Sequence, residues 1–189
     1  MTEETRKILT LFQERRAVLE GHFLLTSGLH SSHYVQCAKI FEDPEIAARV
    51  VKELIKTFDN NQFSWVVGPA VGGILLAYEL AKQLKIKTVY TERENGKMSL
   101  RRGFFIPPES KVLIAEDVLT TGGSVLEVAD LLTKQEIEVV GVAALVNRGN
   151  VHLPYPAHWL LTLDLPAYSS EECPLCKEEK NLVKPGSRT

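Results

Sequence analysis

The sequence has few of the features that mark secreted, membrane or nucleic-acid-binding proteins. Among its 189 residues are only three cysteines, too few for a disulfide framework. No apolar run approaches the roughly 18 residues that a membrane span needs. The first residues, MTEETRKILTLF, contain no apolar signal core. The net charge of −2 argues against a broad nucleic-acid-binding surface. These absences predict a soluble protein of the cytoplasm.

The remaining composition is that of an ordinary globular protein, with 44% hydrophobic and 24% charged residues. The length suits one domain with a full core, and we expect a single domain over 1–189. Its N-terminal part reaches to about residue 40, and a polar, loop-like tail begins at about residue 166.

From residue 45 onward, short apolar runs of strand character alternate with helices of about a dozen residues. This alternation predicts an α/β fold with a mainly parallel central sheet flanked by helices. The segment 94–104 is expected to be a polar loop. The expected strands cover 63–68, 87–93, 111–117, 137–147 and 158–163, and the expected helices cover 3–19, 45–58, 72–85 and 124–134.

The stretch IAEDVLTTGGSVLEV (114–128) carries the strongest functional signal. Ligands of open parallel sheets bind beyond the carboxyl ends of the strands, where this stretch places two acids and a Thr/Gly-rich turn. Gly122 and Gly123 let the backbone turn with its N–H groups inward, and a helix begins at about Ser124. Helix N-termini carry unpaired donors and partial positive charge, so we expect a phosphate cradle here, with hydroxyl donors from Thr120 and Thr121.

The acids Glu116 and Asp117 would repel a phosphate unless they bind something else. Adjacent sugar hydroxyls, or a magnesium ion carried by the substrate, would suit two carboxylates. An ordinary βα turn capped by Thr and Ser stays open as an alternative, although it gives the acids no structural use. Neither G-x-x-x-x-G-K-[ST] nor G-x-G-x-x-G occurs in this stretch.

The segment VLIAEDVLTTGGS (112–124) resembles the phosphoribosyl-pyrophosphate motif of the type I phosphoribosyltransferases. The resemblance implies their fold, with a small N-terminal hood beside the sheet. It also implies that the two acids hold the ribose 2- and 3-hydroxyls and that 120–124 take the 5-phosphate. The implied donor-binding residues in this segment are Glu116, Asp117, Val118, Leu119, Thr120, Thr121, Gly122, Gly123 and Ser124.

Two further segments, GHFLLTSGLHSSHYVQ (21–36) and VVGPAVGGILLA (66–77), resemble those of orotate phosphoribosyltransferases. The likeness runs from about residue 15 to the C-terminus. It implies transfer of phosphoribose to orotate, giving orotidine 5-monophosphate and pyrophosphate in de novo pyrimidine (UMP) biosynthesis. In the second segment, the implied backbone amides for pyrophosphate are those of Gly68, Ala70, Val71 and Gly72.

Orotate is a planar pyrimidine with a carboxylate, which an arginine fork binds better than a lysine. Arg148 matches the base-binding arginine of the family, although it could instead cap a strand end in solvent. His30 and His33 are further candidates, or ordinary loop histidines. The implied orotate-binding residues are Thr26, Ser27, Gly28, Tyr34, Thr120 and Arg148.

The segment ERENGKMSLRRGF (92–104) matches the mobile catalytic loop of the family. By that resemblance Lys97 and Arg93 neutralise the departing pyrophosphate, and Arg101 and Arg102 flank them. The resemblance also implies a homodimer in which residues 93–102 reach the neighbouring site. Magnesium is expected to be carried by the substrate, without a direct protein ligand but with a water-bridged contact to Asp117.

The chain departs from the family in its cations. Many members carry a lysine where Thr26 and Gly72 stand, and a Lys-x-His-Gly sequence where Lys97 is followed by Met-Ser-Leu. Arg148 therefore carries more of the base recognition. Two other functions stay open: a phosphoribosyltransferase for a purine or another base, and a regulator that binds phosphoribosyl pyrophosphate without turnover.

Cys173 and Cys176 form the sequence CPLC, a spacing that can be half of a zinc knuckle. A structural zinc ion needs four ligands, and Cys37 alone cannot complete the set. The sequence therefore favours ordinary tail cysteines.

Overall fold

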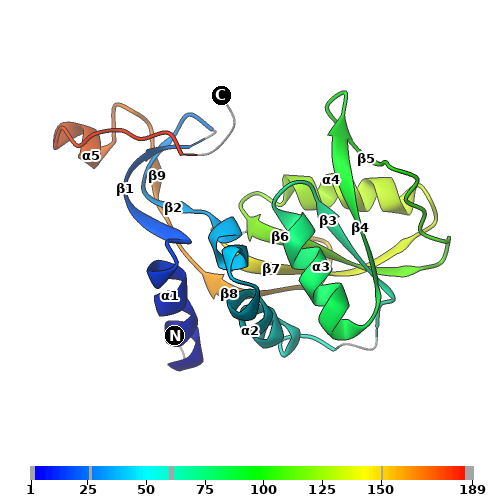
Figure 1. Cartoon of the computed structure of the whole chain (residues 1–189). Helices are drawn as coiled ribbons and strands as arrows, with labels where there is room; N and C mark the ends of the chain where they lie inside the picture. The colour runs from blue at the N-terminus through cyan, green and yellow to red at the C-terminus, as the bar shows by residue number, and fades with distance from the viewer. Residues whose placement is uncertain (1–2, 26, 60–61, 150, 186–189) are drawn as a thin grey trace.

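The structure is a computed structural model that describes residues 3–25, 27–59, 62–149 and 151–185. A six-stranded sheet with helices on both faces forms the main body, and a small three-stranded sheet stands beside it (Figure 1). The strands are β1 (Val18–Leu24), β2 (His30–Val35), β3 (Trp65–Pro69), β4 (Lys87–Glu94), β5 (Lys97–Leu100), β6 (Lys111–Leu119), β7 (Glu138–Asn147), β8 (Ala157–Thr162) and β9 (Ala167–Tyr168). The helices are α1 (Glu3–Glu14), the 3-10 helix η1 (Cys37–Glu42), α2 (Pro44–Ile55), α3 (Gly73–Leu84), α4 (Gly123–Thr133) and α5 (Pro174–Lys177).

The large sheet has the strand order β5-β4-β3-β6-β7-β8, and every neighbouring pair except β4 and β5 is parallel. This arrangement confirms the α/β class predicted from the alternating pattern. After β3 the chain crosses through α3 to β4 on one side, and it later returns to β6 on the other side. The strand order therefore reverses between β3 and β6, which is where open parallel sheets bind ligands.

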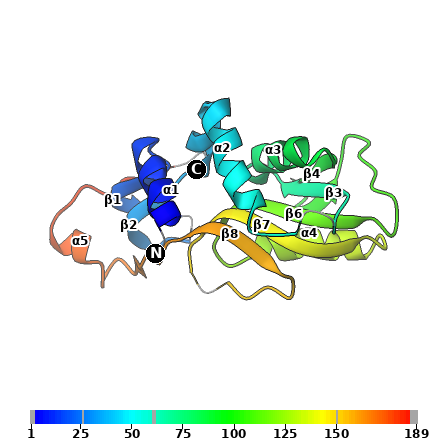
Figure 2. The ribbon, with the colours of Figure 1, turned by 90° about the horizontal axis from the view of Figure 1, so that it is seen from below.

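The two faces of the sheet are covered by different helices, with α2 and α3 on one face and α4 on the other (Figure 2). Side chains of a strand point alternately to the two faces. In β6, Leu113 and Ala115 therefore join the core under α2 and α3, whereas Val112 and Ile114 join the core under α4. This two-sided burial explains why the strand reads as one apolar run.

The helix predicted over 45–58 is confirmed as α2. Its start is fixed by Asp43, whose carboxylate accepts hydrogen bonds from the backbone N–H groups of Glu45 at 3.1 Å and Ile46 at 3.3 Å. Pro44 occupies the first turn, where its missing N–H costs nothing.

The N-terminal hood is the sheet β1-β2-β9, which combines segments from both ends of the chain. The first helix is shorter than the predicted 3–19, because Arg16 adopts a φ of 56° and the chain turns into β1 at Val18. The expectation of a loop-like tail is also wrong in part. Residues of the tail form β9 against β2 and the short helix α5.

The segment 94–104 is likewise not all loop, because β5 pairs antiparallel with β4. Asn95 and Gly96 form the turn between them, with φ values of 50° and 81°. Two positive φ values are what a tight type I′ hairpin turn requires. The hairpin projects from the sheet edge in Figure 1. Within the described ranges, the structure has no helix long and apolar enough to cross a membrane.

Candidate active site

The acid pair lies where β6 no longer pairs with β3 but still pairs with β7. β6 pairs with β3 only as far as Ile114, but with β7 as far as Leu119. The expected strand 111–117 ends with Glu116 and Asp117, but β6 continues to Leu119, so the two acids lie inside the strand and not at its end. Because β3 has already ended its pairing, one edge of β6 is open beside the two acids.

The surroundings of the two carboxyl groups favour a bound cation or hydroxyl donors. Burial, together with repulsion from Asp117, raises the pKa of Glu116 to about 9. Burial also raises the pKa of Asp117. The backbone N–H of Asp117 donates to Glu116 Oε1 at 3.3 Å, and that of Val118 donates to Asp117 Oδ1 at 2.9 Å. A ligand that supplies hydroxyls or positive charge would stabilise the ionised pair.

A buried thiol lies near the same pair. Burial, followed by the charges of Asp117 and Glu116, raises the pKa of Cys37 well above its usual value. Cys37 is fully buried and therefore stays a neutral thiol that packs below the site.

The loop after β3 packs directly on the acid pair. A Cβ atom added to Gly72 would lie 2.5 Å from Asp117 Oδ1, so a side chain at this position would displace the carboxylate. The lysine that many family members carry there therefore does not fit this conformation. The backbone N–H of Ala70 donates to the carbonyl of Thr91 at 2.7 Å and is engaged in the sheet, which leaves Val71 and Gly72 as the candidate amide donors of the loop.

The residues of the predicted phosphate cradle line a small cavity at the start of α4. Residues 116 and 118–125 line a cavity of about 50 Å³. Gly122 has a φ of 80°, and a Cβ atom there would lie 2.8 Å from Leu153 Cδ2, so this turn requires glycine. Thr121 Oγ1 accepts a hydrogen bond from the N–H of Gly123 at 3.3 Å, so the threonine side chain is held at the start of α4.

Arg148 follows β7 directly and is partly buried. Its backbone N–H donates to the carbonyl of Leu119 at 2.8 Å. Its side-chain Nε is buried and is the one such polar atom without a hydrogen-bond partner in the part of the chain that the structure describes. Burial lowers the pKa of Arg148, and the nearby Tyr34 hydroxyl opposes this shift. An unpaired buried guanidinium nitrogen is costly unless a ligand accepts from it.

Tyr34 on β2 of the hood lies near this arginine. That the two residues form opposite walls of a base pocket stays a prediction. The Tyr34 ring lies 5.8 Å from that of Phe23, which fixes it on the hood. Gly28 has a φ of 82° and its N–H donates to the carbonyl of Leu25 at 2.9 Å, so the exposed Ser27 sits in a tight turn. The predicted residue Thr26 lies outside the described residues.

The two predicted catalytic cations differ in their contacts. Arg93 binds both carboxylate oxygens of Glu127 on α4, at 2.7 and 2.8 Å, and the carbonyl of Gly96 at 2.9 Å. Lys97 is exposed, and no hydrogen bond or ion pair of its side chain is found within the described ranges. Arg93 therefore holds the hairpin against α4, whereas Lys97 is available to a ligand. Glu127 had no sequence signal, because it lies 34 residues from its partner.

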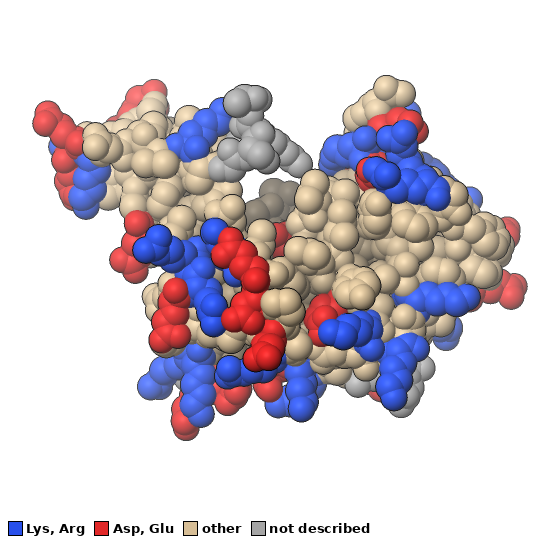
Figure 3. Space-filling model, viewed as in Figure 1, with Lys and Arg blue, Asp and Glu red and all other residues tan. Residues whose placement is uncertain are grey.

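The flanking arginines are also paired, Arg101 with Glu94 at 3.4 Å and Arg102 with Glu92 at 2.8 Å. Lys and Arg side chains gather over the β4–β5 hairpin, across a hollow from the hood (Figure 3). No contact joins the hairpin cations to the acid pair in the described part of this single chain. The structure thus brings together the acids, the cradle, the loop after β3 and Arg148 with Tyr34, but not Lys97.

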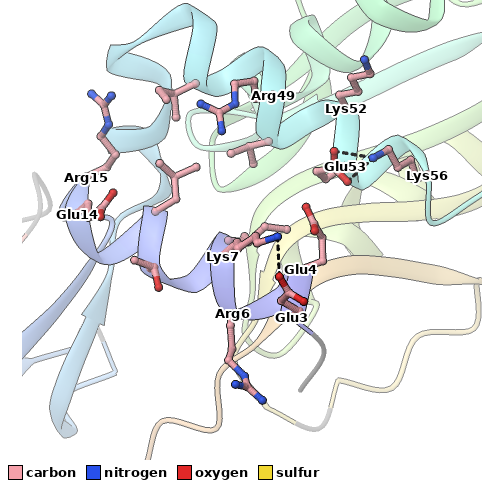
Figure 4. A pocket seen from close by; sticks show the side chains of 15 residues that line it. Glu3, Glu4, Arg6, Lys7, Glu14, Arg15, Arg49, Lys52, Glu53 and Lys56 are labelled. Carbon is pink, nitrogen blue, oxygen red and sulfur yellow. Dashed lines mark hydrogen bonds and ion pairs between the residues drawn. The ribbon is translucent and has the colours of Figure 1, made fainter.

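A larger groove of about 830 Å³ lies elsewhere, between α1 and α2 (Figure 4). Acidic and basic side chains line it together, and two ion pairs join them, Lys7 with Glu3 at 3.0 Å and Lys56 with Glu53 at 2.6 Å. Paired surface charges leave little net attraction for an anion. The cavity lined by residues 116 and 118–125 is therefore the better candidate for chemistry.

Comparison with known proteins agrees with this geometry. Residues 38–163 match the family model of the phosphoribosyl transferase domain. The chain therefore belongs to the phosphoribosyltransferase family. The matched range contains the acid pair, the cradle, the loop after β3 and Arg148, but not the hood.

Individual relatives show to which group within the phosphoribosyltransferase family the chain belongs. The chain is 49% identical over 183 residues to the orotate phosphoribosyltransferase of Thermotoga maritima, covering 96% of this chain and 98% of that protein. It is 50% identical over 182 residues to that of Carboxydothermus hydrogenoformans, covering 94% and 95%. The crystal structure of orotate phosphoribosyltransferase from Aeropyrum pernix superposes with a TM-score of 0.72 at 26% identity, covering 82% of this chain and 93% of that one. Within its family, the chain is a member of the orotate phosphoribosyltransferases.

Proposed function

We propose that this chain transfers phosphoribose from phosphoribosyl pyrophosphate to N1 of orotate, which gives orotidine 5-monophosphate and pyrophosphate, a step of UMP biosynthesis. One observation carries the proposal: a partly buried acid pair and a helix N-terminal cradle meet at the strand-order reversal, next to an arginine whose buried Nε has no partner among the described residues. The relatives named above carry out the reaction that this arrangement fits.

The donor is held in two parts. Glu116 and Asp117 accept hydrogen bonds from the ribose 2- and 3-hydroxyls, which relieves the cost of burying two carboxylates side by side. The 5-phosphate binds the N–H groups at the start of α4 and the hydroxyls of Thr120, Thr121 and Ser124. The backbone amides of Val71 and Gly72 face the pyrophosphate.

The reaction breaks the bond between ribose C1 and the pyrophosphate oxygen and forms a bond from C1 to orotate N1, which gives up its proton to the released pyrophosphate or to water. Positive charge develops on the sugar ring and negative charge on the leaving group. The carboxylates of Glu116 and Asp117 favour the former, and Lys97 with the loop amides favours the latter. Closure of the β4–β5 hairpin would exclude water from the reactive sugar.

Orotate binds between β7 and the hood. The guanidinium of Arg148 forks onto the planar anionic edge of the base, and this gives its buried Nε an acceptor. Thr120 and Tyr34, with the exposed turn at Ser27 and Gly28, form the remaining wall. Thr26 and the histidine His33 stay predictions for this pocket, whereas His30 is buried elsewhere in the hood.

Magnesium, a dimer and the cellular location complete the proposal. Magnesium bound to the donor would neutralise its pyrophosphate, and the acid pair with its raised pKa values is a suitable electrostatic neighbour. A homodimer is proposed because, among the described residues, no contact joins Lys97 to the acid pair of its own chain. In a dimer, Lys97 could reach the acid pair of the neighbouring chain. A cytoplasmic location stays a prediction.

The two other functions have less support. A purine-specific enzyme would share the donor site, but a neutral purine offers no carboxylate to the unpaired Arg148. A regulator without turnover would not need an exposed lysine on a projecting hairpin. The relatives that match nearly the whole chain are named orotate phosphoribosyltransferases.

Two variants separate binding from catalysis. Arg148→Ala should raise the orotate KM by about 10- to 100-fold, the value of a charge-assisted hydrogen bond. Lys97→Ala should instead lower kcat by about 100-fold with a small change in KM, because the lysine acts on the leaving group. Steady-state kinetics of orotate consumption measure both quantities.

Lys52→Ala provides the control, since Lys52 lines the groove between α1 and α2 and should leave both constants unchanged. An unchanged orotate KM in Arg148→Ala would contradict the proposed base site. Loss of donor binding in Lys52→Ala would indicate that the donor binds in the groove between α1 and α2 instead.

A further inference from the structure

A cluster outside the proposed active site joins the hood to the C-terminal tail. It consists of His22 on β1, His30 on β2, Cys173 and Cys176, here called the His2Cys2 cluster. The reaction proposed above uses none of these four side chains. Two come from the start of the chain and two from its end, about 150 residues away, so only folding brings them together.

The ligand atoms of the cluster are close enough to share one ion. His22 Nε2 lies 3.0 Å from His30 Nδ1, 3.4 Å from Cys173 Sγ and 3.7 Å from Cys176 Sγ. His30 Nδ1 lies 3.2 Å from Cys176 Sγ. All four atoms lie within 4.8 Å of one another. Around a tetrahedral zinc ion, the ligand atoms would be about 3.3 to 3.8 Å apart, given the usual Zn–N and Zn–S lengths.

The cluster is also built like a metal site in its burial and its outer contacts. His22, His30 and Cys173 are buried, with exposed fractions of 4%, 6% and 0%. His22 Nδ1 lies 2.9 Å from the carbonyl of Lys180, to which it donates. That hydrogen bond places the proton on Nδ1 and leaves the Nε2 lone pair directed at the cluster. Such a second contact is typical of histidines that bind metals.

The surrounding backbone holds the two halves in place. The N–H of Val183 donates to the carbonyl of His22 at 2.8 Å, and the N–H of Leu24 donates to the carbonyl of Val183 at 2.9 Å. β9 adds a second connection through its pairing with β2. The short helix α5 begins with Pro174, between the two cysteines, so the CPLC turn is fixed in shape.

We propose that His22, His30, Cys173 and Cys176 bind one zinc ion that fastens the C-terminal tail to the hood. Two thiolates and two imidazoles in a tetrahedral arrangement favour zinc over magnesium or calcium, which prefer oxygen ligands. The compact set suits a single ion, because both histidine nitrogens approach a cysteine sulfur as well as each other. The cysteines are therefore metal ligands rather than ordinary tail residues, and the histidines supply the two ligands that Cys37 could not.

The ion would have a structural role. It has no open position for a substrate, since four protein ligands complete a tetrahedral shell. Its effect on the proposed active site is indirect, because the hood it fastens carries Tyr34 and the turn at Gly28. The zinc ion would be bound in the same way whichever base the enzyme uses.

The full-length chain, produced with added zinc and freed of loose metal by dialysis, provides the test. Elemental analysis by mass spectrometry should find about one zinc per chain. Cobalt added to protein stripped of zinc should give the visible bands and the sulfur-to-metal charge-transfer band of a tetrahedral thiolate site. The cobalt spectrum needs no variant, so it stays informative if a variant fails to fold.

Variants identify the ligands. Cys176→Ser and His30→Ala should lose the zinc and the cobalt bands, and Cys176→Ser should no longer lose thermal stability when a chelator is added. Cys37→Ala is the matched control, because it removes a buried thiol outside the cluster and should keep one zinc per chain. Wild-type protein without zinc after loading, a Cys173–Cys176 disulfide in its place, or full zinc content in Cys176→Ser would each overturn the inference.

Discussion

At Glu116 and Asp117, two carboxyl groups lie side by side and partly buried, an arrangement that costs free energy in the protein without ligand. Burial and mutual repulsion keep a proton on Glu116 at a pH where an exposed glutamate has lost it. The donor's ribose hydroxyls and its magnesium would compensate for this cost. The pair therefore contributes to ligand binding at the expense of stability.

Glu116→Gln tests this trade-off. The pKa of Glu116 is raised from 4.5 to about 9 in the folded protein, so the folded state holds its proton more tightly than the unfolded chain does. The contribution of Glu116 to stability therefore falls as the pH rises from about 4.5 to about 9. Glutamine does not ionise, so the variant should unfold a few degrees higher than wild type at pH 8, with little difference near pH 4. Scanning calorimetry at several pH values measures this difference.

The same variant should bind phosphoribosyl pyrophosphate more weakly, because it loses an anionic acceptor for the ribose. Asp130→Asn is the control, since Asp130 is exposed on α4, away from the acid pair, and pairs with Lys134. A difference in unfolding temperature that does not grow with pH would contradict the raised pKa of Glu116.

Among the elements, the β4–β5 hairpin has a clear turn signal in the sequence, although its polar composition favours a loop. The polar composition of 94–104 predicted a loop, yet Asn95-Gly96 is the strongest short hairpin signal. The buried Met98 and the pairing of Arg93 with Met98 show that β5 is a true strand. The turn places Lys97 directly after Gly96, so the conformation of the turn sets the direction of the lysine.

Gly96→Val should therefore lower kcat without unfolding the protein. Valine is strained at the φ of 81° that Gly96 adopts, at a cost of about 1–2 kcal/mol, and it would distort the exposed turn. We expect a kcat lowered about tenfold and an unfolding temperature lowered by only a few degrees, measured by steady-state kinetics and thermal denaturation. Asn95→Gly should retain activity because glycine accepts the same turn. Equal activity of Gly96→Val and wild type would show that the hairpin does not position a catalytic group.

The elements of the large sheet could be predicted from the sequence because each carries its own local pattern. Asp43 and Pro44 start α2, and the apolar runs of β3, β6 and β7 mark strands buried on both faces. The hood could not be predicted in this way. β9 has two residues and depends on its pairing with β2, and β1 begins where the first helix was expected to continue.

For the whole molecule, the topology explains why distant segments meet. The crossing from β3 to β4 and the return to β6 put the loop after β3 next to the acid pair, and β7 then brings Arg148 beside the cradle. The motif residues could be predicted because they are contiguous in the chain. The Arg93–Glu127 pair and the His2Cys2 cluster could not, because their members lie 34 and about 150 residues apart.

The proposed homodimer gives a test at this scale. If residues 93–102 serve the neighbouring site, then Lys97→Ala and Glu116→Ala chains restore one intact site when they pair. An equal mixture of subunits should regain about a quarter of the wild-type activity, since half of the dimers are mixed and each has one good site. Co-refolding of the two inactive variants, followed by the orotate assay, measures the recovery. No recovery in verified mixed dimers would assign the hairpin to its own chain.

The most direct test of the central claim is turnover by the wild-type protein with a panel of bases. Purified protein with magnesium and phosphoribosyl pyrophosphate is mixed with orotate, and the loss of orotate absorbance is followed. Parallel reactions contain uracil, adenine, hypoxanthine or xanthine. The structure and the relatives predict turnover with orotate alone, which releases one pyrophosphate for each orotidine 5-monophosphate formed. Turnover with a purine in preference to orotate, or donor binding without turnover of any base, would contradict the account.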